Sequence, residues 1–162
     1  MKKPNSKNIK IEELIKNNFD FSKIKIGLVI SVFNEEISQD LRSEVLNELK
    51  KHDIKIKDQN YFVEIYVPGV FELSQSAYHL AKTSKYDAII CLGAVIKGET
   101  KHDEYISMSA GYGITQASIL TDTPMIFGVL TTENIQQAKE RISKGSYYAK
   151  SALEMAIVNS SS

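Results

Sequence analysis

An apolar run in the middle of the chain decides the fold: Ala88-Ile89-Ile90-Cys91-Leu92-Gly93. A short apolar run without alternating polar residues is typical of a β-strand that is buried on both faces. The nearly uninterrupted apolar stretch ends at Ile96, far short of the ~20 residues that a membrane span needs. We therefore interpret it as a strand of a parallel sheet, and we expect no membrane association.

Three more strands and four helices are predicted around this run. The other β-rich or apolar runs are 26–30, 61–67 and 125–130, and apolar residues recur at helical spacing in 38–51, 73–81, 106–117 and 135–158. Alternation of strands and helices favours a parallel sheet with helices on both faces. We predict an α/β fold of three layers (αβα) with a four-stranded parallel sheet, flavodoxin-like, and a break in the last helix near Gly145.

The chain of 162 residues is long enough for one folded domain, which we place at residues 25–158. Residues 1–24 are polar and rich in Lys and Asn, so we expect an arm or short helix that lies outside the core. Residues 159–162 form the expected C-terminal tail.

Composition and charge exclude several classes of function. Twenty Lys or Arg balance twenty Asp or Glu, so the zero net charge gives no electrostatic reason to expect nucleic-acid binding. The single cysteine, Cys91, cannot form an internal disulfide or a cysteine-cluster metal site, and the three separated histidines lack metal-ligand spacing. No apolar stretch follows the basic N-terminus, so we expect no signal peptide and a cytoplasmic location.

Ligands of open parallel sheets bind beyond the carboxyl ends of the strands. These ends are predicted at 31–36, 67–72, 93–102 and 130–134. At the first, Phe33 either stacks on a planar heterocycle or fills the seam between helix and sheet. At the second, Glu72 follows a Pro-Gly turn and either faces the dipole of the next helix or accepts hydrogen bonds from ligand hydroxyls.

The third strand end carries the most chemical information. Thr100 and Asp103 resemble a helix-capping box, which would turn the amides near Glu99 and Thr100 outward as an anion site. His102 would stand beside that anion, and imidazole is the side chain that transfers protons near neutral pH. The alternative is a surface histidine in the first turn of a helix. We interpret His52 and His79 as structural.

The last region adds Phe127 in a predicted strand and Arg141 in the final helix. Arginine is favoured for phosphate recognition, although a lone arginine on a helix is usually part of a solvated face. The glycine-bearing loop after the third strand matches neither GxGxxG nor GxxxxGK[ST], the two common nucleotide-binding patterns.

Taken together, the four strand ends resemble the 6,7-dimethyl-8-ribityllumazine synthase family of riboflavin biosynthesis. The resemblance runs from about Lys25 to Ile157, and its motifs stand in the family's order and spacing. They are Val32-Phe33-Asn34-Glu35, Val67-Pro68-Gly69-Val70-Phe71-Glu72, Leu92-Gly93-Ala94-Val95-Ile96-Lys97-Gly98-Glu99-Thr100-Lys101-His102 and Phe127-Gly128-Val129-Leu130-Thr131-Thr132-Glu133-Asn134.

The resemblance implies a transferase without a metal or redox cofactor. It would condense 5-amino-6-(D-ribitylamino)uracil with 3,4-dihydroxy-2-butanone 4-phosphate and release phosphate and water. It also implies the role of each site residue. The pyrimidine and its ribityl chain would contact Phe33, Val70, Phe71, Glu72, Ala94, Val95, Ile96 and Phe127; the phosphate would contact Glu99, Thr100 and Arg141; and His102 would transfer protons.

The resemblance further implies a homo-oligomer, either a pentamer or a sixty-subunit shell, in which Phe127 and Arg141 come from the adjacent subunit. Riboflavin synthase is a possible protein partner. The sequence also departs from the family pattern, with Asp103 in place of an aromatic residue, Lys97 in place of Arg, and a short loop after Arg141. This short form resembles the archaeal branch, and Lys144 is the candidate to replace the family's phosphate-site lysine.

Two other functions remain open from the sequence. One is a non-catalytic ligand binder or shell component of the same fold, which the intact Phe33, Glu72, His102 and Arg141 disfavour. The other is a generic flavin or phosphate binder. The absence of Trp and of a glycine- and hydroxyl-rich loop after the first strand disfavours it.

Overall fold

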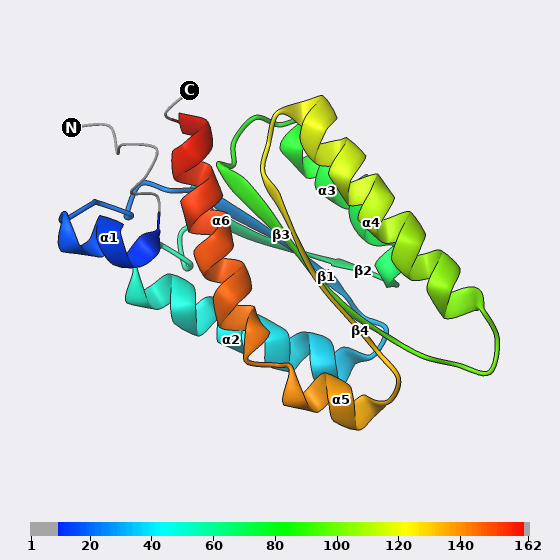
Figure 1. Ribbon diagram of the computed structural model, residues 1–162. Coiled ribbons are helices and arrows are strands. Elements are labelled where there is room, and N and C mark those ends of the chain that lie inside the picture. The colour runs from blue at the N-terminus through cyan, green and yellow to red at the C-terminus, as the bar shows by residue number, and fades with distance from the viewer. Residues whose placement is uncertain (1–9, 161–162) are drawn as a thin grey trace.

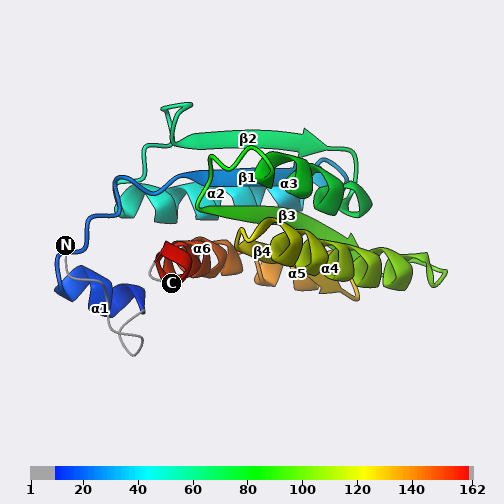
Figure 2. The ribbon, with the colours of Figure 1, turned by 90° about the horizontal axis from the view of Figure 1, so that it is seen from above.

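The computed structural model describes residues 10–160. Its centre is a parallel four-stranded sheet in the order β2-β1-β3-β4, and Figure 2 shows β2, β1 and β3 lying side by side. The strands are β1 (Ile26–Ser31), β2 (Phe62–Val67), β3 (Ala88–Ile96) and β4 (Met125–Thr132). The order runs outward from β1 first to one side and then to the other, as in doubly wound folds.

Helices cover both faces of the sheet (Figure 1). One layer holds α1 (Ile11–Lys16), α2 (Glu35–Lys51), α5 (Ile135–Glu140) and α6 (Lys144–Ser160). The other holds the 3₁₀ turn η1 (Val70–Glu72), α3 (Leu73–Ala81) and α4 (His102–Thr121). The predicted α/β, flavodoxin-like arrangement of three layers is confirmed.

The two central strands are buried on both faces. Leu28 and Leu92 face the layer of α2 and α6, whereas Val29 and Cys91 face α3 and α4. Burial on both sides explains why these strands read as continuous apolar runs rather than as alternating ones. Burial also raises the pKa of the Cys91 thiol to about 12, so the only cysteine is a protonated core group rather than a nucleophile.

The expectation that residues 1–24 lie outside the core is wrong for the residues that the structure describes. Ile11 and Leu14 are buried in the same cluster as α2 and α6, and the Ile11 N–H donates to Glu154 Oε1 at 2.9 Å. Their spacing of three residues places both on one face of α1, which packs against α6. Residues 1–9 of the expected arm lie outside the described part.

The expected break of the last helix near Gly145 is confirmed. The break lies at residues 141–143, between α5 and α6, and Gly145 is inside α6. A Cβ at Gly145 would lie 2.7 Å from the Leu41 carbonyl oxygen, so this glycine serves the close approach of α6 to α2. At its other end α6 continues to Ser160, two residues beyond the expected domain end, and residues 161–162 lie outside the described part.

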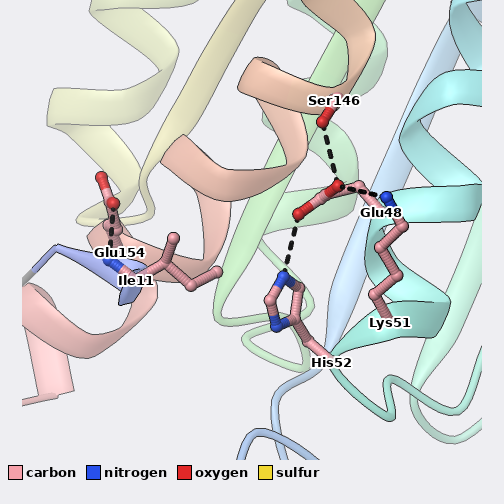
Figure 3. A network of polar contacts seen from close by, with 6 residues as sticks. All are labelled: Ile11, Glu48, Lys51, His52, Ser146 and Glu154. Atoms are coloured by element: carbon pink, nitrogen blue, oxygen red, sulfur yellow. Dashed lines mark hydrogen bonds and ion pairs between the residues drawn. The ribbon is translucent and has the colours of Figure 1, made fainter. Parts of the chain in front are cut away.

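A buried carboxylate joins α2 to the start of α6 (Figure 3). Glu48 accepts a hydrogen bond from Ser146 Oγ at 2.9 Å, and its other oxygen lies 2.9 Å from His52 Nε2. Lys51 Nζ is 3.6 Å away. Burial opposes the ionisation of Glu48, but the bonds from His52 and Ser146 and the charge of Lys150 outweigh it and lower its pKa. Glu48 is therefore a charged tie between two helices.

This tie predicts a pH-dependent stability. Because the folded state lowers the pKa of Glu48, its contribution is complete above about pH 4.3, the usual glutamate value, and is lost as the pH falls through the lowered value. We expect Glu48→Gln to cost ~1–3 kcal/mol of unfolding free energy at pH 7 and progressively less below pH ~4. Urea titrations between pH 3 and 7 measure this difference.

The matched control is Glu12→Gln, which removes an exposed carboxylate in the first turn of α1. It should change the unfolding free energy by less than ~0.5 kcal/mol at every pH. A deficit of Glu48→Gln that is the same at pH 3 and pH 7 would contradict the charged tie.

Candidate active site

A cavity of about 650 Å³ opens at the carboxyl ends of β1 and β3. This is the place where the strand order reverses direction and where ligands of doubly wound sheets bind. The cavity is lined by residues from four segments: Phe33 and Asn34 after β1; Pro68, Gly69, Val70, Phe71 and Glu72 around η1; Ala94, Val95, Ile96, Gly98 and Thr100 from the end of β3 onward; and His102, Asp103 and Ile106 in α4.

Phe33 forms an exposed aromatic wall of this cavity. Its backbone N–H donates to the Pro68 carbonyl at 3.0 Å, so the turn after β1 continues alongside the end of β2. The side chain is 70% exposed, which excludes the reading in which Phe33 fills the seam between helix and sheet. An exposed ring at a cavity wall is available for stacking on a planar ligand.

The turn at η1 supplies an apolar floor and an acidic group. Val70 is buried, whereas Phe71 is 59% exposed and Glu72 is exposed. Glu72 stands at the N-cap of α3, yet its side chain makes no capping hydrogen bond there. Its carboxylate therefore remains available to accept hydrogen bonds from a ligand in the cavity.

The third wall is the end of β3. This strand pairs with β1 only as far as Leu92, but it pairs with β4 as far as Ile96. Residues 93–96 therefore project past β1, and Ala94, Val95 and Ile96 line the cavity beside it. Ala94 and Val95 are nearly fully buried, so this wall presents backbone and small apolar groups.

The predicted capping box at α4 is not formed. The helix begins at His102 with Lys101 as N-cap, and no side chain caps it. Thr100 Oγ1 instead accepts from the His102 N–H at 3.3 Å, a tight turn that precedes the helix. Thr100 and His102 nevertheless both line the cavity, and His102 is exposed there.

The cavity gathers nine of the twelve site residues named from the sequence. Glu99 is exposed in the same loop but does not line it. Phe127 is 41% exposed on the edge strand β4, where its ring lies against Gly111 of α4. Arg141 ends α5 in the opposite helical layer, and its guanidinium donates to the Gln137 carbonyl at 2.8 Å.

Asn34 and Asp103 line the cavity although neither was named as a site residue from the sequence. Asn34 precedes two glutamates at the start of α2, where asparagine is a common helix-capping residue. Asp103 reads as part of a capping box. Both residue types are common at helix starts, so only the structure shows that they face the cavity.

An ion pair borders the site beyond β3. Lys97 Nζ lies 3.1 Å from Glu133 Oε2, and the hydrogen bond and charge of Glu133 raise the pKa of Lys97. Within residues 10–160, no group of His, Cys, Asp and Glu side chains is arranged to hold a metal ion. The helices of this described part are also too short or too polar to cross a membrane.

These features define an α/β protein with a cavity at the switch point of its sheet. The family model of 6,7-dimethyl-8-ribityllumazine synthase matches residues 23–160. The chain belongs to this family, which functions in riboflavin biosynthesis. The match extends over the whole cavity and over Phe127 and Arg141 as well.

One prediction concerns the wall between β3 and η1. A Cβ at Gly93 would lie 2.7 Å from Val70 Cγ2 and 3.1 Å from Ser31 Cβ. Since Val70 and Ser31 are buried, Gly93→Ala must displace η1, and we expect it to cost ~1–3 kcal/mol of unfolding free energy. Denaturant titration measures the loss.

Gly98→Ala is the matched control, because a Cβ there would meet no atom within 4 Å. It should remain within ~0.5 kcal/mol of the wild type. Equal stability of the two alanine variants would mean that Gly93 is not required for this close contact.

Proposed function

We propose that the protein condenses 5-amino-6-(D-ribitylamino)uracil with 3,4-dihydroxy-2-butanone 4-phosphate to give 6,7-dimethyl-8-ribityllumazine, phosphate and water. The observation that carries this proposal is the single cavity in which residues from three of the four family motifs meet. In this proposal the protein is a transferase that needs no metal or redox cofactor. A cytoplasmic location stays a prediction from the sequence.

The pyrimidine would occupy the space between Phe33 and the end of β3. Its ring would stack on the exposed Phe33 ring, opposite the backbone of Ala94, Val95 and Ile96. Val70 and Phe71 would enclose the pyrimidine and the start of the ribityl chain, and the Glu72 carboxylate would accept hydrogen bonds from the ribityl hydroxyls. In this placement the aromatic wall would stack on the ring, the apolar wall would enclose it, and the acidic group would bind the hydroxyls.

The phosphate would lie at the loop before α4. The backbone amides of Glu99 and Thr100 would donate to it, and Arg141 would pair with its charge. His102, beside Thr100 in the cavity wall, would deliver a proton to the departing hydroxyl as the imine forms and then shuttle the proton released with phosphate. Most of the rate would come from holding the two substrates in alignment.

Phe127 and Arg141 would reach the cavity from a neighbouring copy of the chain, because neither lines it within one copy. An apolar stripe along α4 supports such assembly, and its five side chains are 69–74% exposed: Tyr105, Met108, Tyr112, Ile119 and Leu120. A stripe of this size favours burial against another surface. We propose a homo-oligomer, either a pentamer or a larger shell, with riboflavin synthase as a possible further partner.

The first test is an assay of the purified protein with both substrates, following fluorescent lumazine and released phosphate against the uncatalysed background. We expect turnover well above background. Arg141→Ala should lower kcat/KM for the butanone phosphate by ~10- to 100-fold, because it removes a charged hydrogen-bond donor to phosphate. Lys85→Ala, which removes an exposed cation that does not line the cavity, should leave kcat/KM unchanged.

Failure of a properly assembled wild-type oligomer to accelerate the reaction would overturn the proposed function. It would favour a non-catalytic binder of the same fold instead. An Arg141→Ala variant that turns over like the wild type would leave the reaction in place but remove Arg141 from the phosphate site.

A second prediction separates proton transfer from alignment. His102→Ala should lose the ~10²- to 10⁴-fold that general acid–base catalysis supplies. It should still react above background, because the amine is already nucleophilic and alignment alone is worth several kcal/mol. Single-turnover measurements on assembled protein that binds substrate normally give the answer. Complete loss of turnover would show that His102 does more than shuttle protons.

A further inference from the structure

Asn34 occupies the N-cap of α2 but does not cap the helix. An N-cap asparagine usually accepts a hydrogen bond from an amide of the first turn, an interaction worth ~1 kcal/mol. Here no capping bond is made, and Asn34 Nδ2 donates to the Ala94 carbonyl oxygen at 2.9 Å. Because a carbonyl oxygen only accepts, the NH₂ of Asn34 must face Ala94.

The bonded carbonyl lies where β3 has lost its neighbour. β3 pairs with β1 as far as Leu92, and Ala94 stands two residues further along, paired with Leu130 of β4. The Asn34 side chain therefore supplies a partner to β3 beyond the end of β1. Without that bond, the buried Ala94 carbonyl would lose its partner at an opened cavity wall, which carries a free-energy cost.

The turn that carries Phe33 is held from two sides. On the β2 side, the Val32 N–H donates to the Val67 carbonyl at 2.8 Å and the Phe33 N–H donates to the Pro68 carbonyl at 3.0 Å. On the β3 side, the Asn34 amide holds the turn to Ala94. Phe33 and Ala94 both line the cavity, so the Asn34 bond joins the Phe33 turn to the β3 wall at the cavity's edge.

We propose that Asn34 is a positioning residue that fixes the distance between the Phe33 ring and the end of β3. This inference rests on the proposed function, which places the pyrimidine between those two walls. When the Phe33 ring and the end of β3 already stand at the distance that a flat ring needs, binding carries no free-energy cost for ordering the turn. The role is specific to the pyrimidine, because the butanone phosphate is placed at the loop before α4.

The backbone at Asn34 allows two informative substitutions. Its φ of 58° and ψ of 48° lie in the left-handed region, which asparagine, aspartate and glycine tolerate best. Asn34→Gly removes the bond and keeps the backbone conformation. Asn34→Asp keeps the size of the side chain but, when ionised, directs an acceptor at the carbonyl oxygen. When protonated, the same aspartic acid can donate to that carbonyl.

The experiment compares both KM values of the two variants with those of the wild type. At pH 7.5 we expect Asn34→Asp to raise the KM of the aminouracil ~10-fold and Asn34→Gly to raise it ~3-fold. The KM of the butanone phosphate and kcat should stay within ~2-fold. Asn18→Asp is the matched control, because Asn18 is also left-handed, with φ of 53°, and does not line the cavity.

The pH dependence separates positioning from a general loss of structure. As the pH falls toward 5, the defect of Asn34→Asp should shrink, because the Ala94 carbonyl oxygen disfavours the ionised carboxyl and the protonated form regains a donor, whereas that of Asn34→Gly should stay constant. Glu72, His102 and Asp103 also line the cavity, Glu35 and Glu36 stand in the first turn of α2, and all five are present in every variant. Each KM is therefore taken as a ratio to the wild type at the same pH.

A crystal structure of ligand-free Asn34→Gly completes the test and does not depend on turnover. We expect the Phe33 turn to be displaced from β3. An unmoved turn, with or without a raised KM, would overturn the positioning role; a raised KM would then assign Asn34 a direct substrate contact. An active wild type with unchanged KM in both variants would also overturn it. A wild type without turnover refutes the proposed function instead, and the displacement of the turn then decides the role of Asn34.

Discussion

The unequal length of two neighbouring strands is the constraint on which the site depends. β1 ends at Ser31, opposite the middle of β3, while β3 continues with β4 to Ile96. The end of β3 thus loses one neighbour, and the cavity occupies the space left beside it. η1 closes that space because Gly93 lets Val70 approach β3. A one-residue shift of β1 against β3 would exchange the two faces of the strand and destroy both the core and the site.

The fold could be predicted because the composition of a strand indicates whether the sheet buries it on one face or on both. Ala88–Ile96 is apolar throughout, and the structure buries it on both faces. The N-terminal segment shows the limit of this reasoning. Ile11 and Leu14 are two apolar residues in a mostly polar segment. So short a pattern does not show that α1 packs against α6. The helix break near Gly145 was predicted, but a glycine can accompany either a break or a close contact, and only the tertiary packing shows that Gly145 serves the contact with α2.

The candidate site was predictable as far as strand ends meet at one edge of a parallel sheet. Phe33, Glu72, Ala94 and His102 were named from separate segments and lie around one cavity. The details at helix starts were not predictable. Thr100 and Asn34 both belong to residue types that cap helices, yet one forms a turn before α4 and the other bonds β3. Local sequence gives the hydrogen-bonding capacity of such a side chain, whereas the neighbouring strand determines where that capacity is used.

The charges around the cavity link its chemistry to assembly. Of the described residues that line it, Glu72 and Asp103 are acidic, and no lysine or arginine is among them. A phosphate bound there would meet amides and His102 but also the field of two carboxylates, so binding a dianion requires positive charge from outside the lining. Arg141 lies in the other helical layer of the same chain. If a neighbouring copy supplies it, the phosphate-bearing substrate binds only the assembled form and stabilises the assembly by the same free energy. In this arrangement, burial of the apolar stripe on α4 and binding of phosphate are thermodynamically linked, because both depend on the association of the same two copies.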